Sequence, residues 1–337
     1  SGDVNVLRNI EVQVSATLMG GNINLTASNN ISGVITANTG NGSVTLVNNA
    51  NTTLGNGANW NFEVLGGVNV TVTGENNTLI QSSAITVANG LSVTTANGAV
   101  NLTDGNNSIS GALSANIGTA ALSVANNGAL TLGNITANSA SITLGAGALS
   151  QDNGTNVSVG ALDIQTNNGS ANLSAGSNNQ ITGNLTARLG TGELTVNNNN
   201  ALTLGDIAVG ALTLTTVGEN SSIVATGTNT ITGVIAVDAA SGNGNLTLSN
   251  SVETSLGNIT ANVASFDVSA GNLTQVSGNL AVLGLDIQTN NANANLSYGT
   301  YNQVSGNLTA RLGTGDLTVT NNNALTLGDI TAGAVTL

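Results

Sequence analysis

Sixteen carboxylates and three arginines are the charged side chains of this chain, which has no histidine or cysteine. Cleavage of a glycosidic bond by acid–base catalysis needs two carboxyl groups about 5 to 10 Å apart. Asp163 and Asp286 each lie in a phrase LDIQT without a second carboxylate nearby in sequence. Asp163 and Glu193 could share one face of the fold, but nothing in the sequence marks them as a pair. We therefore predict that the chain is not an enzyme.

Two aspartates, Asp206 and Asp329, lie in the phrase LGDI, where another copy of the phrase has Asn134. Exchange between Asp and Asn is typical of a turn residue whose side chain bonds the local backbone. A calcium site would need more carboxylates. The lack of His and Cys disfavours zinc and copper sites. We predict no metal and no cofactor.

The arginines suggest ion pairs at the corners of the fold. Arg188 and Glu193 flank the turn RLGTGE, and Arg311 and Asp316 repeat this arrangement. We expect each pair to form a surface salt bridge across a corner, which contributes less than about 1 kcal/mol. Binding of a ligand by the arginines is the alternative.

Asparagine pairs recur at equivalent places in the repeats. They are Asn48–Asn49, Asn126–Asn127, Asn198–Asn199 and Asn321–Asn322. Stacked asparagine side chains form amide ladders in cross-β structures, and we expect such ladders or turns here. An exposed, asparagine-rich face that binds glycans is the alternative.

Charge and hydropathy restrict the partners of the chain. The net charge is -13 and the carboxylates are scattered, so the clustered cations that bind nucleic acid are missing. Apolar residues make up 40% of the chain, too many for a disordered segment, and none of the apolar runs is long enough for a membrane-spanning helix. We expect no nucleic acid partner and no insertion into a membrane. The chain starts at SGDVNV without a signal peptide, so we expect its export signal to lie elsewhere.

Alternation of apolar and polar residues predicts β-strands throughout the chain. Phrases such as ALTLTT, SVTLV and ELTVN alternate with period two and are rich in β-branched residues. Gly and Asn interrupt them every five to ten residues, which favours tight corners. Only five residues are aromatic, so we expect a narrow core of stacked Leu, Val and Ile.

Repeats give the size of the structural unit. A signature [IV]-[ST]-G, followed by alternating residues and usually by an Asn pair and L-G-[ND], is anchored at Gly33, Gly111, Gly183, Gly233 and Gly306. The spacings are 78, 72, 50 and 73 residues, and the short one lacks a segment of about 22 to 24 residues. A segment that can be lost whole is one coil of a solenoid. We predict a β-solenoid with about 24 residues per rung and roughly 14 rungs.

A longer duplication supports one architecture for the whole chain. Residues 162–214 recur as 285–337 without a gap, and 41 of the 53 positions are identical. We expect residues 1–337 to form a single continuous solenoid that is a fragment of a longer protein.

The rungs and the phrases ALTLGDI, GALTLTTVG and NLTA resemble the repeats of filamentous-haemagglutinin-type adhesins of Gram-negative bacteria. The resemblance implies a right-handed parallel β-helix exported by two-partner secretion or as an autotransporter passenger. It also implies a stalk or fibre segment at the cell surface that mediates attachment between cells, to surfaces or in a biofilm matrix. Extracellular polysaccharide, a host or neighbouring cell surface, and other copies of the chain are the expected partners. A lectin-like solenoid and a self-assembling sheath or surface-layer protein are the alternatives.

Overall fold

The computed structural model describes residues 2–6, 11–12, 15–55, 61–239 and 244–337. Arg8 and Trp60 lie outside the described residues. The chain divides into two compact units, Ser1–Asn167 and Asn168–Leu337. A single continuous solenoid over the whole chain therefore stays a prediction.

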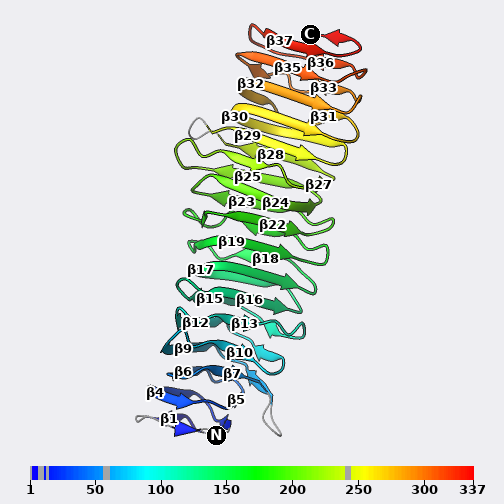
Figure 1. The fold of residues 1–337 in the computed structure, drawn as a ribbon. Coiled ribbons are helices and arrows are strands. Elements are labelled where there is room, and N and C mark those ends of the chain that lie inside the picture. The colour runs from blue at the N-terminus through cyan, green and yellow to red at the C-terminus, as the bar shows by residue number, and fades with distance from the viewer. Residues whose placement is uncertain (1, 7–10, 13–14, 56–60, 240–243) are drawn as a thin grey trace. The chain divides into compact units, whose positions relative to one another are not determined.

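Every regular element of the described residues is a β-strand (Figure 1). The first unit contains β1 (Val4–Val6), β2 (Glu11–Val12), β3 (Ser15–Met19), β4 (Ile23–Ile31), β5 (Val34–Asn38), β6 (Val44–Asn48), β7 (Thr52–Leu54), β8 (Phe62–Val64), β9 (Val68–Glu75), β10 (Leu79–Gln81), β11 (Ile85–Val87), β12 (Leu91–Ala96), β13 (Val100–Leu102), β14 (Ser108–Ile109), β15 (Ala112–Asn116), β16 (Ala121–Asn126), β17 (Leu130–Leu144), β18 (Leu149–Gln151) and β19 (Val157–Gln165). The second unit contains β20 (Ala171–Leu173), β21 (Gln180–Ile181), β22 (Asn184–Arg188), β23 (Leu194–Asn198), β24 (Leu202–Val209), β25 (Leu212–Thr216), β26 (Ile223–Ala225), β27 (Thr230–Ile231), β28 (Val234–Asp238), β29 (Leu246–Asn250), β30 (Thr254–Val268), β31 (Leu273–Gln275), β32 (Leu280–Thr289), β33 (Ala294–Leu296), β34 (Gln303–Val304), β35 (Asn307–Arg311), β36 (Leu317–Val319), β37 (Thr326–Thr331) and β38 (Val335–Thr336). Among these residues no helix is long and apolar enough to cross a membrane.

Within each unit the strands of successive coils pair in parallel. β6, β9, β12 and β15 form one such row in the first unit, and β23, β25 and β28 form another in the second. Parallel pairing of strands from consecutive coils is the defining geometry of a β-solenoid. The prediction of an all-β parallel solenoid is confirmed.

The core of each unit is a stack of aliphatic side chains. Strands bury alternate residues, as in β25, where Leu212 and Leu214 are fully buried. Phe62 and Phe266 are the large exceptions, and each is 1% exposed. Adjacent coils lie so close at some corners that only glycine fits: an added Cβ at Gly98 would lie 1.6 Å from the carbonyl oxygen of Asn77.

The number of successive strand pairings between two signature glycines gives the number of coils between them. In the first unit, β5 follows Gly33, and three pairings lead from β5 through β8 and β11 to β14, after which the next signature strand begins. In the second unit, two pairings lead from β22 through β24 to β27. Three pairings lead from β28 through β30 and β32 to β34. The 50-residue interval therefore contains one coil fewer than the 73-residue interval, as the spacing predicts.

The coils of the first unit include the expected rung length, since Val44 and Val68 are in register 24 residues apart, whereas the coils of the second unit are shorter. In the second unit, residues in register are between 18 apart (Leu194 and Leu212) and 23 apart (Ala171 and Leu194). The last strand of each series of pairings, such as β27, lies directly before the next signature strand, here β28. Each interval between signatures therefore contains whole coils and, in addition, the length of one further strand. Division of the interval by the number of coils therefore overestimates the coil.

Candidate functional site

Arg311 forms an ion pair with a residue that the sequence analysis did not assign to it. A terminal nitrogen of its guanidinium lies 2.8 Å from Oδ2 of Asp286, on the preceding coil. Parallel pairing of β32 with β35 places Asp286 beside Thr309 and Gln288 beside Arg311. Oδ1 of Asp316 instead accepts a hydrogen bond from the backbone N–H of Ala334. The predicted pair of Arg311 with Asp316 is wrong, because register between coils, and not proximity across a turn, selects the partner.

The first long copy has Arg188 at the position of Arg311. Arg188 ends β22, as Arg311 ends β35, and it takes part in an interaction. The backbone N–H of Glu193 donates to the hydroxyl of Ser170 at 3.0 Å. A salt bridge between Arg188 and Glu193 stays a prediction.

Asp286 is the centre of a polar cluster on the outer face of β30, β32 and β35. Its carboxylate accepts hydrogen bonds from the hydroxyl of Thr309, from the hydroxyl of Ser265 at 3.3 Å and from Arg311. The Nε–H of Arg311 also donates to Oε1 of Gln288 at 3.3 Å. Partial burial raises the pKa of Asp286, but the hydrogen bonds from Thr309 and Arg311 and the charge of Arg311 outweigh it and hold the pKa below 3.8.

The ion pair and hydrogen bonds of this cluster join consecutive coils. A groove of about 410 Å³ lies beside it, lined by apolar and small residues such as Val263, Leu283 and Gly306. Asp286 is the one carboxylate among the lining residues, so a second carboxyl group for glycosidic cleavage is missing there. Over the described residues, no three carboxylates come together as a metal site.

Asp286→Asn is expected to lower the free energy of unfolding by less than about 1 kcal/mol, because both partners of the ion pair are partly exposed. The lowered pKa means that the contribution is present above pH 3.8 and is lost as the pH falls through the lower, folded-state pKa. Urea unfolding between pH 2 and 7 measures this difference. Asp206→Asn is the control, since other copies have Asn at its position. Equal pH profiles for wild type and Asp286→Asn would contradict the assignment.

The first asparagine of each pair is a bridge between coils. Oδ1 of Asn198 accepts from the backbone N–H of Ile181 at 2.8 Å, and its Nδ2 donates to the carbonyl of Ile181 at 3.0 Å. The side-chain amide of Asn198 thus satisfies the backbone N–H and carbonyl of Ile181, the last residue of β21, as a neighbouring strand would do. The same two bonds join Asn48 to Ile31, Asn126 to Ile109, Asn250 to Ile231 and Asn321 to Val304.

These bridges correct the expectation of amide ladders for the first members of the pairs, whereas the second member Asn199 does donate its Nδ2 to Oδ1 of Asn178 on the preceding coil at 2.8 Å. Asn126 stands in register with Leu144, and Asn198 with Thr216, so neither stacks on another asparagine. Asn126 and Asn198 are buried, Asn321 is half-buried, and the second members of the pairs are more exposed. Those second members, Asn127, Asn199 and Asn322, donate their backbone N–H to the carbonyl of an asparagine in the preceding coil.

That preceding asparagine is a structural residue that the sequence analysis missed. It lies four residues before each anchoring glycine, and it is at most 1% exposed in all five copies: Asn29, Asn107, Asn179, Asn229 and Asn302. In two copies it also forms reciprocal amide bonds with a glutamine, Gln81 with Asn107 and Gln275 with Asn302. The invariant offset from the glycine was the available signal.

The aspartate of the LGD phrase accepts a hydrogen bond from the backbone of the next coil. Oδ1 of Asp206 accepts the backbone N–H of Thr228, 22 residues later, at 3.0 Å. Asn134 and Asn258 do the same for Asn156 and Asn279. Only an acceptor oxygen is needed, so Asp and Asn exchange freely. The expectation of a turn residue that bonds the local backbone is wrong, because Asp206 lies within β24 and its partner lies in the next coil.

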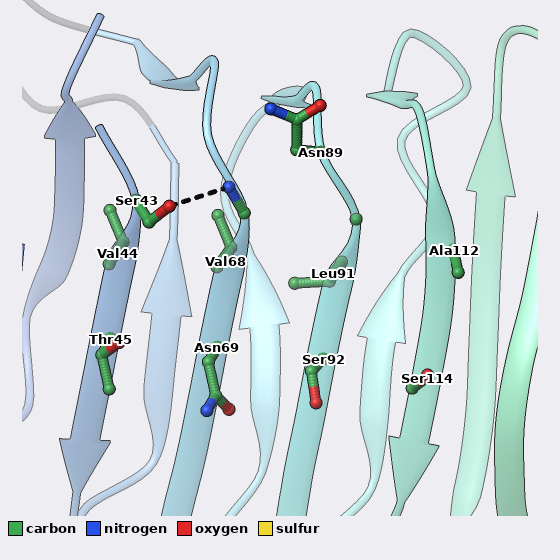
Figure 2. A pocket seen from close by; sticks show the side chains of 12 residues that line it. Ser43, Val44, Thr45, Val68, Asn69, Asn89, Leu91, Ser92, Ala112 and Ser114 are labelled. Carbon is green, nitrogen blue, oxygen red and sulfur yellow. Dashed lines mark hydrogen bonds between the residues drawn. The ribbon is translucent and has the colours of Figure 1, made fainter. Parts of the chain in front are cut away.

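A shallow groove of about 360 Å³ crosses β6, β9, β12 and β15 (Figure 2). Thr45, Asn69, Ser92 and Ser114 stand in register along it and point outward, while Val44, Val68 and Leu91 are buried beneath. The hydroxyl of Ser43 accepts the backbone N–H of Gly67 at 3.2 Å, which fixes one end of the row. The groove has no charged and no aromatic lining residue, so it offers hydroxyl and amide groups to a neutral ligand.

Comparison with known proteins gives no match. The chain matches no protein-family model, no curated protein and no solved structure.

Proposed function

We propose that the chain is a structural stalk or fibre segment of a secreted bacterial surface adhesin. The observation that supports this role most directly is the bridging of consecutive coils by buried asparagines, in addition to the backbone ladder. A protein under mechanical load benefits when every coil is bonded to the next, because local opening then requires several hydrogen bonds to break together. The segment would space attachment regions of a longer protein away from the cell.

The distribution of polar groups also supports a spacer. Buried polar side chains of the described residues all have hydrogen-bond partners, and these partners are mostly backbone groups, both of the same coil and of adjacent coils. The charged cluster around Asp286 clamps two coils and has no second carboxylate beside it. These groups therefore serve cohesion between coils and not chemistry on a substrate.

Display on a bacterial surface tests the role. We would place the 337-residue chain between an outer-membrane anchor and a biotin-binding module and measure capture of biotinylated beads under flow. The expected result is capture that survives protease treatment and high shear, because the bonded coils resist cleavage and unfolding. A Gly/Ser linker of equal residue number is the matched control and should be cleaved. Cleavage of the chain at the same rate as the linker would contradict the stalk role.

A lectin-like role is the second candidate, and the uncharged groove over β6, β9, β12 and β15 favours it. Self-assembly into a sheath would show in a second arm of the display experiment, in which cells carry the chain without the biotin-binding module. Such cells would then aggregate with one another.

A further inference from the structure

The aromatic residues of the chain fall into two classes. Phe62 and Phe266 are 1% exposed and belong to the core. Tyr298 and Tyr301 are 60% and 67% exposed, and they are the only tyrosines of the chain. Both lie in the loop 297–302, between β33 and β34. Each ring presents an apolar face and a hydroxyl to solvent, three residues apart in one loop, which is a combination that suits contact with a ligand.

The duplication shows that the fold does not require these rings. The loop SYGTYNQ corresponds to SAGSNNQ in the first long copy, where Ala175 and Asn178 stand at the positions of Tyr298 and Tyr301. Of the 12 substitutions between the copies, only these two introduce an aromatic residue. Whatever the tyrosines do is specific to the second copy.

The loop that carries the tyrosines is firmly held. Asn302, which follows Tyr301 and is 1% exposed, forms two amide bonds of 2.9 Å with Gln275. The backbone N–H of Tyr301 donates to Oδ1 of Asn279 at 3.1 Å. An added Cβ at Gly299 would lie 2.2 Å from Oδ1 of Asn302, so the loop packs tightly on that amide. A preorganised loop loses little conformational entropy when a ligand binds.

The surroundings of the loop are uncharged. The neighbouring coils contribute residues 276–279 and 320–323, which are bonded to the loop through Asn279 and Asn302 and contain only Val, Ser, Gly, Asn and Thr. Exposed Val276 and the two rings supply apolar surface, while amides and hydroxyls supply hydrogen-bonding groups. An acidic or basic partner would find no counter-charge here. A stable protein interface needs about 1,000 Å² of buried surface, far more than two rings and one valine supply.

We propose that Tyr298 and Tyr301 form a binding site for a neutral glycan. The rings would contact the C–H faces of sugar residues, and the amides and hydroxyls around the loop would bond the sugar hydroxyls. The site adds a ligand to the attachment role proposed above but does not depend on it, since a chain can bind glycan whether or not it is a stalk. It also uses different residues from the groove of the first unit.

The duplication supplies the variant that tests the site. Tyr298→Ala/Tyr301→Asn restores the residues of the first copy and should fold normally, which circular dichroism and the thermal midpoint verify. Binding of the full chain to dextran, mannan, galactan and cellohexaose would be measured by calorimetry, with alginate as the anionic comparison. We expect wild type to bind at least one neutral glycan, and the double variant to bind about tenfold more weakly or worse. Tyr298→Phe/Tyr301→Phe should bind within a few-fold of wild type, since the rings remain.

Several outcomes overturn the proposal. They are a lack of binding to every neutral glycan, equal binding by wild type and Tyr298→Ala/Tyr301→Asn, and preference for alginate. Asn69→Ala in the groove of the first unit is the second control, and it should leave binding at the tyrosines unchanged. Loss of binding in Asn69→Ala alone would assign the glycan to the groove instead. The display experiment on the stalk role is unaffected by any of these results.

Discussion

Asn302→Ala is expected to lower the free energy of unfolding by about 3 kcal/mol or more, because several buried groups lose their partners together. Oδ1 of Asn302 accepts from the backbone N–H of Leu280 at 2.9 Å, and its Nδ2 donates to the carbonyl of Thr320 at 3.1 Å. Gln275, itself 3% exposed, would lose both of its amide bonds to Asn302. The substitution therefore leaves unsatisfied polar groups on three consecutive coils. Urea unfolding followed by circular dichroism measures the change.

Two controls separate this effect from a general sensitivity to substitution. Asn322→Ala removes an exposed amide from the same region and should change the free energy of unfolding by less than about 0.5 kcal/mol. Asn302→Asp keeps the shape but removes the donor, so it should also be strongly destabilising. Hydrogen exchange at the amide of Leu280 should accelerate in Asn302→Ala. A variant as stable as Asn322→Ala would show that the bridge contributes little.

Deletion of residues 264–284 is expected to give a folded chain that is one coil shorter. Ala264 pairs in register with Leu285, so the junction places Leu285 at the position of Ala264, opposite Leu246. The second unit already contains this arrangement, because Leu194 pairs with Leu212 in the interval that has one coil fewer. Coils that contact only their neighbours allow such a removal. It takes away the amide bonds of Gln275 to Asn302 and places Ile259, the register partner of Leu280, opposite Asn302, so some loss of stability accompanies the shorter fold. Circular dichroism, protease resistance and cooperative urea unfolding check it.

A deletion of the wrong length is the matched control. Removal of residues 264–273 takes out only part of a coil, so the following strands lose their register with the coil before them. Since side chains alternate between the core and the surface, apolar residues would then become exposed. We expect this variant to lose cooperative unfolding. Similar behaviour of the two deletions would contradict the view that coils are the independent units of this fold.

Much of the fold was predictable from the sequence because strand patterning and corners are local. Alternation in phrases such as ALTLTT identifies the buried residues, and β25 buries Leu212 and Leu214 as expected. The unequal spacing of the signature glycines revealed a coil that one interval lacks. The exact length of a coil was not accessible, since the additional strand in each interval becomes visible only when pairing is known.

The partners of polar side chains were decided by tertiary structure alone. Arg311 contacts Asp286 because the register of the parallel coils places Gln288 beside Arg311, and Asp286 lies two residues before Gln288 on the same strand. Asp316 across the turn is bonded to the next coil. Asn198 likewise bonds Ile181 on the preceding coil. The sequence by itself determined what is buried and where the chain turns, since those depend on hydropathy and backbone preference. Register between coils determined which residues meet, and that depends on the stacking of the whole unit.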